Sequence, residues 1–75
     1  MLRLGEILTL DNNKKYIVAG TTYHDNELYC YLVEMNNTKN TDMYLVKDNQ
    51  LVQVIDENLI KELEISIANN IKEDL

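Results

Sequence analysis

Hydrophobic and polar residues alternate in short runs along residues 3–55, and Asn- and Asp-rich segments separate the runs. A period of two is typical of β-strands, whose successive side chains point to opposite faces of a sheet. The segments 11–14, 24–26 and 48–49 suit turns, because Asn and Asp tolerate positive φ and make local hydrogen bonds. The pattern predicts five strands, at residues 3–10, 15–23, 27–35, 42–47 and 50–55.

The third run is apolar on both faces, which sets it apart from the others. Leu28, Cys30 and Leu32 fall on one face, and Tyr29, Tyr31, Val33 and Met35 fall on the other. Such a strand is predicted to lie in the centre of the sheet, with both sides covered. Gly20 is expected to mark a bulge or bend in the second strand. Residues 36–41 are all polar and predict the longest and most mobile loop.

After Asp56 the hydrophobic period changes to that of an amphipathic helix. Asp56 is a good N-cap, and its charge together with that of Glu57 complements the positive end of the helix dipole. One apolar stripe follows, made of Leu59, Ile60, Leu63, Ile67 and Ile71. Ile65 falls off this stripe, so it is expected either to be exposed or to widen the apolar face for a partner.

These elements predict a mainly β fold with one C-terminal α-helix. The sheet is expected to be a five-stranded SH3-like small barrel or a strongly bent antiparallel meander, because closing or curling a sheet protects its edges. Residues 1–75 form a single domain in this interpretation, with 1–55 as the sheet and 56–75 as the acidic helix. A domain of this size buries only roughly 60% of its unfolded surface, so further buried surface such as a dimer interface would matter.

The net charge of −6 changes the range of expected partners. Residues 1–55 carry five Lys/Arg against seven Asp/Glu, and residues 56–75 carry two against six. A negative domain is repelled by phosphate backbones, which disfavours nucleic acid as a partner. The chain also lacks a run of roughly 18 apolar residues and a secretory leader at its first residues, so we expect a cytoplasmic protein with no membrane partner.

Residue usage and four segments suggest an origin. Ten Asn, one Arg and no Pro, Phe or Trp are typical of an AT-rich genome, such as that of a low-GC bacterium or its phage. The segments 7–11, 15–18, 28–34 and 51–57 resemble a small, uncharacterised bacterial domain-of-unknown-function family of acidic β-rich proteins. The resemblance covers about residues 5–64. It implies an intracellular protein with a compact β domain, and it transfers no functional residues because that family has no established activity.

The chain offers few residues for catalysis or metal binding. His24 beside Asp25 is the one candidate base with an orienting carboxylate, and the only serine, Ser66, lies far along the chain in the helix. Residues 11–13 begin like a calcium loop, but the central Gly and the closing Glu are missing. One His and one Cys cannot supply the four ligands of a structural zinc site. We therefore expect no catalytic residues, no metal and no cofactor, and we interpret Cys30 as a buried small hydrophobic residue.

The paired tyrosines of the third strand leave three interpretations open. Tyr29 and Tyr31 could pack in the core beneath the helix, form a protein interface, or stack on bases. The acidic helix surface could be a solvated face or a docking strip for a basic partner. The candidate interface comprises Tyr29, Tyr31, Leu59, Ile60, Leu63, Ile67 and Ile71.

The functional prediction from the sequence is a small cytoplasmic protein-interaction or regulatory module without catalysis. Its partner is an unidentified protein or a second copy of the chain, paired through the apolar helix face. RNA binding through Tyr29 and Tyr31 is the alternative, since small barrels often bind RNA. An enzyme acting through His24 is a third and less favoured alternative.

Overall fold

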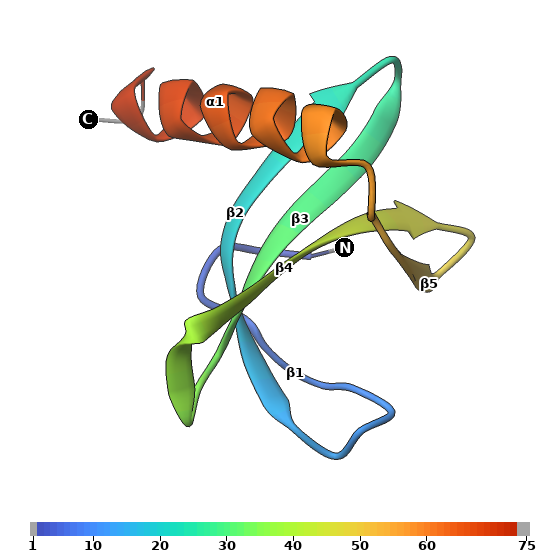
Figure 1. Cartoon of the computed structure of the whole chain (residues 1–75), viewed down its shortest axis with the longest axis vertical. Coiled ribbons are helices and arrows are strands. Elements are labelled where there is room, and N and C mark those ends of the chain that lie inside the picture. The colour runs from blue at the N-terminus through green and yellow to red at the C-terminus, as the bar shows by residue number, and fades with distance from the viewer. Residues whose placement is uncertain (1, 74–75) are drawn as a thin grey trace.

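The computed structural model describes residues 2–73, with side chains as far as residue 70. One antiparallel sheet contains five strands in chain order: β1 (Ile7–Thr9), β2 (Lys15–His24), β3 (Glu27–Glu34), β4 (Asn37–Lys47) and β5 (Gln50–Gln53). A single helix, α1 (Glu57–Glu73), follows β5. Figure 1 shows the sheet curling strongly, with α1 lying across one end of β2 and β3. The predicted mainly β fold with a C-terminal helix is confirmed.

The sheet is a curled half-barrel. Its order runs from β1 to β5, and within the described residues these two end strands are not paired with each other. The structure therefore takes the bent-meander form of the prediction. β1 is shorter than predicted because Gly5 adopts a φ of +83° inside the expected strand, and β5 ends at Gln53, after which residues 54–56 lead into α1.

Two of the tight turns use the same Asp-Asn pair. Asp25 and Asn26 have φ values of +51° and +67°, and Asp48 and Asn49 have values of +51° and +64°. A two-residue loop with both φ values positive is the type I′ turn, whose twist matches that of the flanking strands. The Asp-Asn pairs thus set the registers of the β2–β3 and β4–β5 hairpins, which close at His24 with Glu27 and at Lys47 with Gln50.

Both faces of β3 are covered, as its sequence predicts. On the face away from α1, the inner core contains Tyr16, Val18, Cys30 and Leu32. On the opposite face, the helix core contains Tyr29, Met43, Leu63 and Ile67. β3 lies in the centre of the strand order, so its alternate side chains contribute to both cores.

A bulge in β2 decides what α1 packs against. The register shifts between Val18 and Gly20, which makes Ala19 an extra residue on β2. Side chains two positions apart normally share a face, but an extra residue moves the following positions to the other face. Val18 therefore packs in the inner core, whereas Gly20 and Thr22 contact α1. The predicted bulge at Gly20 is confirmed.

The predicted loop at residues 36–41 is wrong, because most of it belongs to β4. β4 begins at Asn37, and the register shift between Val33 and Glu34 accommodates extra residues on the β4 side. The buried carboxylate of Glu34 contacts one polar residue of this segment. Its Oε1 accepts a hydrogen bond from Asn40 Nδ2 at 3.3 Å and lies 3.4 Å from Lys14 Nζ. The hydrogen bond from Asn40 satisfies a buried polar group at this end of β4.

Asp56 caps α1 as the sequence predicts. Its Oδ1 accepts hydrogen bonds from the backbone N–H groups of Asn58, at 2.9 Å, and Leu59, at 3.2 Å. These two donors have no partner within the helix, so the cap satisfies them and fixes where α1 begins.

Candidate functional site: the Tyr31 groove

The floor of the candidate site forms where α1 approaches β2 most closely. Gly20 pairs in register with Tyr31, and Tyr31 pairs with Met43, so the three positions are neighbours across the sheet. Because Gly20 has no side chain, Ile67 of α1 occupies the space above it, and a Cβ added at Gly20 would overlap Ile67 Cγ2. The helix is thus held against the sheet beside Tyr31.

Two neighbouring depressions flank Tyr31, and we call them together the Tyr31 groove. One, of about 350 Å³, is lined by Ala19, Tyr31, Glu64, Ile67 and Ala68. The other, of about 300 Å³, lies beside the connection between β5 and α1. Its lining includes Tyr31, Asp42, Ile55, Glu57, Ile60 and Glu64. Tyr31 and Glu64 line both depressions, so the two lie side by side along α1.

The groove combines an apolar floor with an acidic rim. Met43 and Ile67 in its floor are only 2% and 6% exposed, whereas Ile55 at its end is 84% exposed. Asp42, Glu57 and Glu64 supply three carboxylates, and no Lys or Arg lines the groove in the described part of the chain. Asp42 Oδ1 accepts a hydrogen bond from Gln53 Nε2 at 3.4 Å, which positions this carboxylate. The arrangement favours a ligand that is cationic and carries an apolar group.

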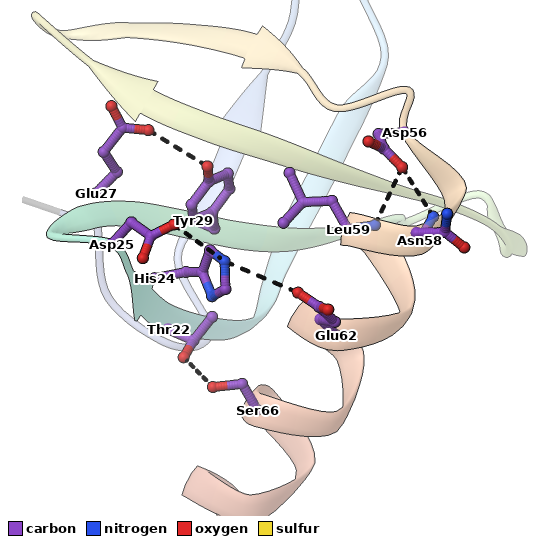
Figure 2. Close-up of polar contacts among 10 residues, drawn as sticks. All are labelled: Thr22, His24, Asp25, Glu27, Tyr29, Asp56, Asn58, Leu59, Glu62 and Ser66. Carbon is purple, nitrogen blue, oxygen red and sulfur yellow. Dashed lines mark hydrogen bonds and ion pairs between the residues drawn. The ribbon is translucent and has the colours of Figure 1, made fainter.

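A polar seam joins β2 to the other side of α1 (Figure 2). The hydroxyl oxygens of Thr22 and Ser66 lie 2.6 Å apart, and Asn70 Nδ2 donates to Thr22 Oγ1 and to the Thr21 carbonyl oxygen, each at 3.3 Å. Nearby, His24 Nε2 lies 3.9 Å from Glu62 Oε2. The seam satisfies polar groups at the edge of the helix core and fixes the position of α1 along β2.

His24 and Tyr29 form the end of this seam nearest the β2–β3 turn. His24 Nε2 lies 3.5 Å from Asp25 Oδ2, and its ring meets the Tyr29 ring edge-on with centroids 6.3 Å apart. The Tyr29 hydroxyl donates to Glu27 Oε2 at 3.3 Å. Burial, and then the neighbouring Glu27 carboxylate, raise the pKa of the Tyr29 phenol. The Ser66 hydroxyl lies against Thr22, and His24 lies near the carboxylates of Asp25 and Glu62, so these contacts do not form a Ser–His pair.

The sequence analysis missed the polar seam, although a signal for it exists. Glu62, Ser66 and Asn70 follow one another at spacings of four residues, which places them in one polar row beside the apolar stripe of α1. Their partner Thr22 becomes accessible to that row only because of the bulge at Ala19. The helical row could be found from the sequence, but its partner strand required the register.

Cys30 lies in the inner core, away from the groove and the seam. Its side chain is 0% exposed, and burial raises the pKa of the thiol to about 11. A thiol held in the protonated form is a poor nucleophile and a poor metal ligand. Cys30 is therefore packed as a small hydrophobic residue, in agreement with its interpretation from the sequence.

The residues of the predicted interface take different positions. Tyr29, Leu63 and Ile67 are buried between α1 and the sheet, at 6%, 0% and 6% exposure. Tyr31, Leu59 and Ile60 are partly buried at the margin of the same core, and Tyr31 and Ile60 line the groove. The Ile71 side chain lies outside the described residues. Ile65, which the pattern placed off the stripe, is 64% exposed.

Two further observations concern metals and membranes. Among the described residues, no group of three or more His, Cys, Asp or Glu side chains is arranged to hold a metal ion. Within the same part of the chain, α1 is neither long enough nor apolar enough to span a bilayer.

Comparison with known proteins gave no relative from which residues could be transferred. The chain matches no family model, no curated protein and no solved structure. The family resemblance drawn from its sequence stays a prediction.

Proposed function

We propose that this chain is a small, non-catalytic protein-interaction module of the cytoplasm, and that it binds a segment of its partner in the Tyr31 groove. The observation that carries the proposal is the combination of an apolar floor with three rim carboxylates, Asp42, Glu57 and Glu64, and no lining cation among the described residues. A partner segment that carries Lys or Arg around an apolar side chain complements both features.

The walls of the groove are regular, packed elements of the fold. Its walls come from a helix that is capped at Asp56 and packed through Leu63, and from the central strand of the sheet. A preformed site avoids the entropy cost of ordering the binding surface, so even a small contact can be selective. Tyr31 lies in the middle of this surface and is the natural central contact, because tyrosine combines a large apolar ring with a polar hydroxyl.

A protein partner is favoured over RNA by two observations. Tyr29, which would have to stack on a base, is 6% exposed and lies beneath α1. The three carboxylates around Tyr31 would repel a phosphate backbone. Similarly, a second copy of a chain of net charge −6 would bring like charges together at this groove. Self-association is therefore disfavoured, and RNA binding is the alternative that the experiment must distinguish.

The proposal is tested with a labelled cationic peptide and two helix variants of equal charge. The probe is fluorescein-Lys-Lys-Leu-Lys-Lys-Leu-Lys-amide, and its anisotropy is measured on addition of the protein. Glu64→Lys places a cation in the groove, whereas Glu62→Lys makes the same charge change beside His24. We expect Glu64→Lys to weaken binding roughly tenfold and Glu62→Lys to have a much smaller effect.

Equal effects of the two variants would show that the peptide responds only to net charge, and the groove would then be wrong as the binding site. The same measurement with labelled oligo(U) RNA tests the alternative. Binding of the RNA together with no binding of the cationic peptide would replace the protein-interaction proposal with RNA recognition.

A further inference from the structure

Within residues 2–73, β1 is an end strand, and its outer edge has no partner strand. Val18 N–H donates to the Glu6 carbonyl oxygen and Leu10 N–H donates to the Lys14 carbonyl oxygen, at 2.9 and 3.1 Å. Hydrogen-bonded positions alternate along an antiparallel pair of strands. Between these two bonds, Leu8 is therefore the residue of β1 whose N–H and C=O groups face β2. The intervening residues Ile7 and Thr9 then direct their N–H and C=O groups away from β2, to the open edge of the sheet.

The Met35–Lys15 contact supports this assignment independently. Met35 N–H donates to the Lys15 carbonyl oxygen at 2.9 Å, so the backbone of Lys15 faces β3. Thr9 is the register partner of Lys15 on β1. The backbone N–H and C=O of one strand residue point to the same side. Because those of Lys15 point to β3, they do not bond to Thr9, and the Thr9 N–H points to the open edge.

The open edge lies beside two hollows of the half-barrel. One cavity of about 600 Å³ and another of about 380 Å³ share Thr9, Leu10, Gln50 and Leu51 in their linings, and we call them together the β1–β5 gap. Leu8, Leu10, Val46 and Leu51 are partly buried and extend the inner core to this gap. The gap shares no lining residue with the Tyr31 groove. Figure 1 shows β1 and β5 as the first and last strands of the curled sheet.

The charges around the gap select the kind of segment that can fill it. Glu6 and Asp11 bracket β1, and they are the charged side chains in the linings of the two cavities. A strand with Lys or Arg at both ends would place its cations near these carboxylates. A second copy of this chain, with net charge −6, fits less well because it would add negative charge at the same place.

We propose that the β1 edge accepts an extended segment of another protein as an additional strand. The segment has alternating apolar residues, which enter the β1–β5 gap, and basic residues at its ends, which pair with Glu6 and Asp11. The backbone groups of Ile7 and Thr9 supply the main-chain hydrogen bonds of strand addition, in which bonds of this kind give affinity and alternate side chains give specificity. This site goes beyond the proposed function of the Tyr31 groove and is independent of it.

The experiment uses a defined probe, acetyl-Lys-Val-Thr-Val-Thr-Val-Lys-amide, and the full chain. Binding is followed by NMR, together with hydrogen exchange of the Ile7 and Thr9 amides. Thr9→Pro removes the outward N–H without touching the β1–β2 bonds, since proline is tolerated where the N–H of an edge strand faces solvent. Thr9→Val is the matched control that keeps the N–H and the strand propensity.

We expect the peptide to protect the Ile7 amide and, in the unmodified chain, the Thr9 amide. Thr9→Pro should weaken binding roughly tenfold and Thr9→Val should leave it nearly unchanged, because loss of one hydrogen bond costs about that factor. A peptide with Glu in place of both Lys residues tests the charge argument without any change in the protein, and it should also bind roughly tenfold more weakly.

Three outcomes would overturn the inference. The first is absence of protection at Ile7 and Thr9 with saturating peptide. The second is protection confined to Leu51 and Gln53, which would assign the acceptor edge to β5. The third is protection of β1 in the free protein that depends on protein concentration and accompanies dimers in light scattering, which would identify a second copy as the occupant.

Discussion

Ile67 packs against Gly20 so closely that a Cβ at position 20 would overlap its Cγ2. This contact joins the bulge in β2 to the buried face of α1, and it places the helix beside Tyr31. The shape of the Tyr31 groove therefore depends on a residue without a side chain in a strand that is otherwise rich in β-branched and aromatic residues.

Gly20→Ala should destabilise the protein through this contact. Overpacking a filled site typically costs about 1–3 kcal/mol in the free energy of unfolding, measured here by urea denaturation. In an Ile67→Ala background the overlapping methyl group is gone, so the same Gly20→Ala change should cost clearly less. Equal costs in the two backgrounds would mean that Ile67 is not what limits position 20.

Leu63→Ala should produce one of the largest losses of stability of any single substitution in α1. Leu63 is 0% exposed in the helix core, and a Leu-to-Ala change in a core costs about 2–5 kcal/mol through lost burial and the cavity left behind. Ile65→Ala is the control on the same helix, since Ile65 is 64% exposed and should change stability by less than about 0.5 kcal/mol. Similar losses from both would refute the assigned helix face.

The Thr22–Ser66 pair should contribute a measurable coupling. Thr22→Val, Ser66→Ala and the double variant form a thermodynamic cycle in the free energy of unfolding. With the two hydroxyl oxygens 2.6 Å apart at the seam, we expect a coupling of about 0.5–1.5 kcal/mol. Additive effects of the two substitutions would show that the hydroxyl groups do not interact in solution.

Cys30 should make stability depend on pH under alkaline conditions. Burial raises the pKa of its thiol from 9.0 to about 11, so folding favours the protonated form. This contribution is present in full below pH 9 and is lost as the pH rises through about 11, because the unfolded chain loses the proton first. The decrease should reach roughly 2–3 kcal/mol at most.

Cys30→Ala is the control for this pH dependence, since Tyr29 and Tyr44 also have pKa values raised by burial and act in the same direction. The free energy of unfolding of the two proteins is compared from pH 8 to 11. The unmodified chain should show the steeper decrease. Parallel curves would mean that the Cys30 thiol titrates normally in the folded state.

Local signals in the sequence predicted much of the fold. The Asp-Asn pairs at 25–26 and 48–49 determined two hairpins, Asp56 determined the start of α1, and the doubly apolar run at 27–35 identified the central strand. Each of these features depends on residues that are close together in the chain. The apolar stripe of α1 was equally readable and contains Leu63 and Ile67, but the pattern left open whether the stripe packs on the sheet, where both residues are buried, or on another chain.

Features that depend on contacts between distant residues were not predicted. Residues 37–41 belong to β4, where Asn40 donates to the Glu34 carboxylate that also lies near Lys14, and these contacts are visible only in the folded chain. The acidic rim of the Tyr31 groove likewise joins Asp42 from the sheet to Glu57 and Glu64 from α1. Pattern analysis identified Tyr31 and Ile60 as interface candidates but could not join them to these carboxylates.

The most direct test of the central claim is an NMR map of the binding surface. Amide shifts of the unmodified protein are recorded while the Lys-Lys-Leu-Lys-Lys-Leu-Lys peptide is added. We expect the largest changes to cluster at Tyr31, Asp42, Ile60 and Glu64, around the groove. Changes spread evenly over all the acidic residues, or centred on Glu62 and Asp25 beside His24, would contradict it.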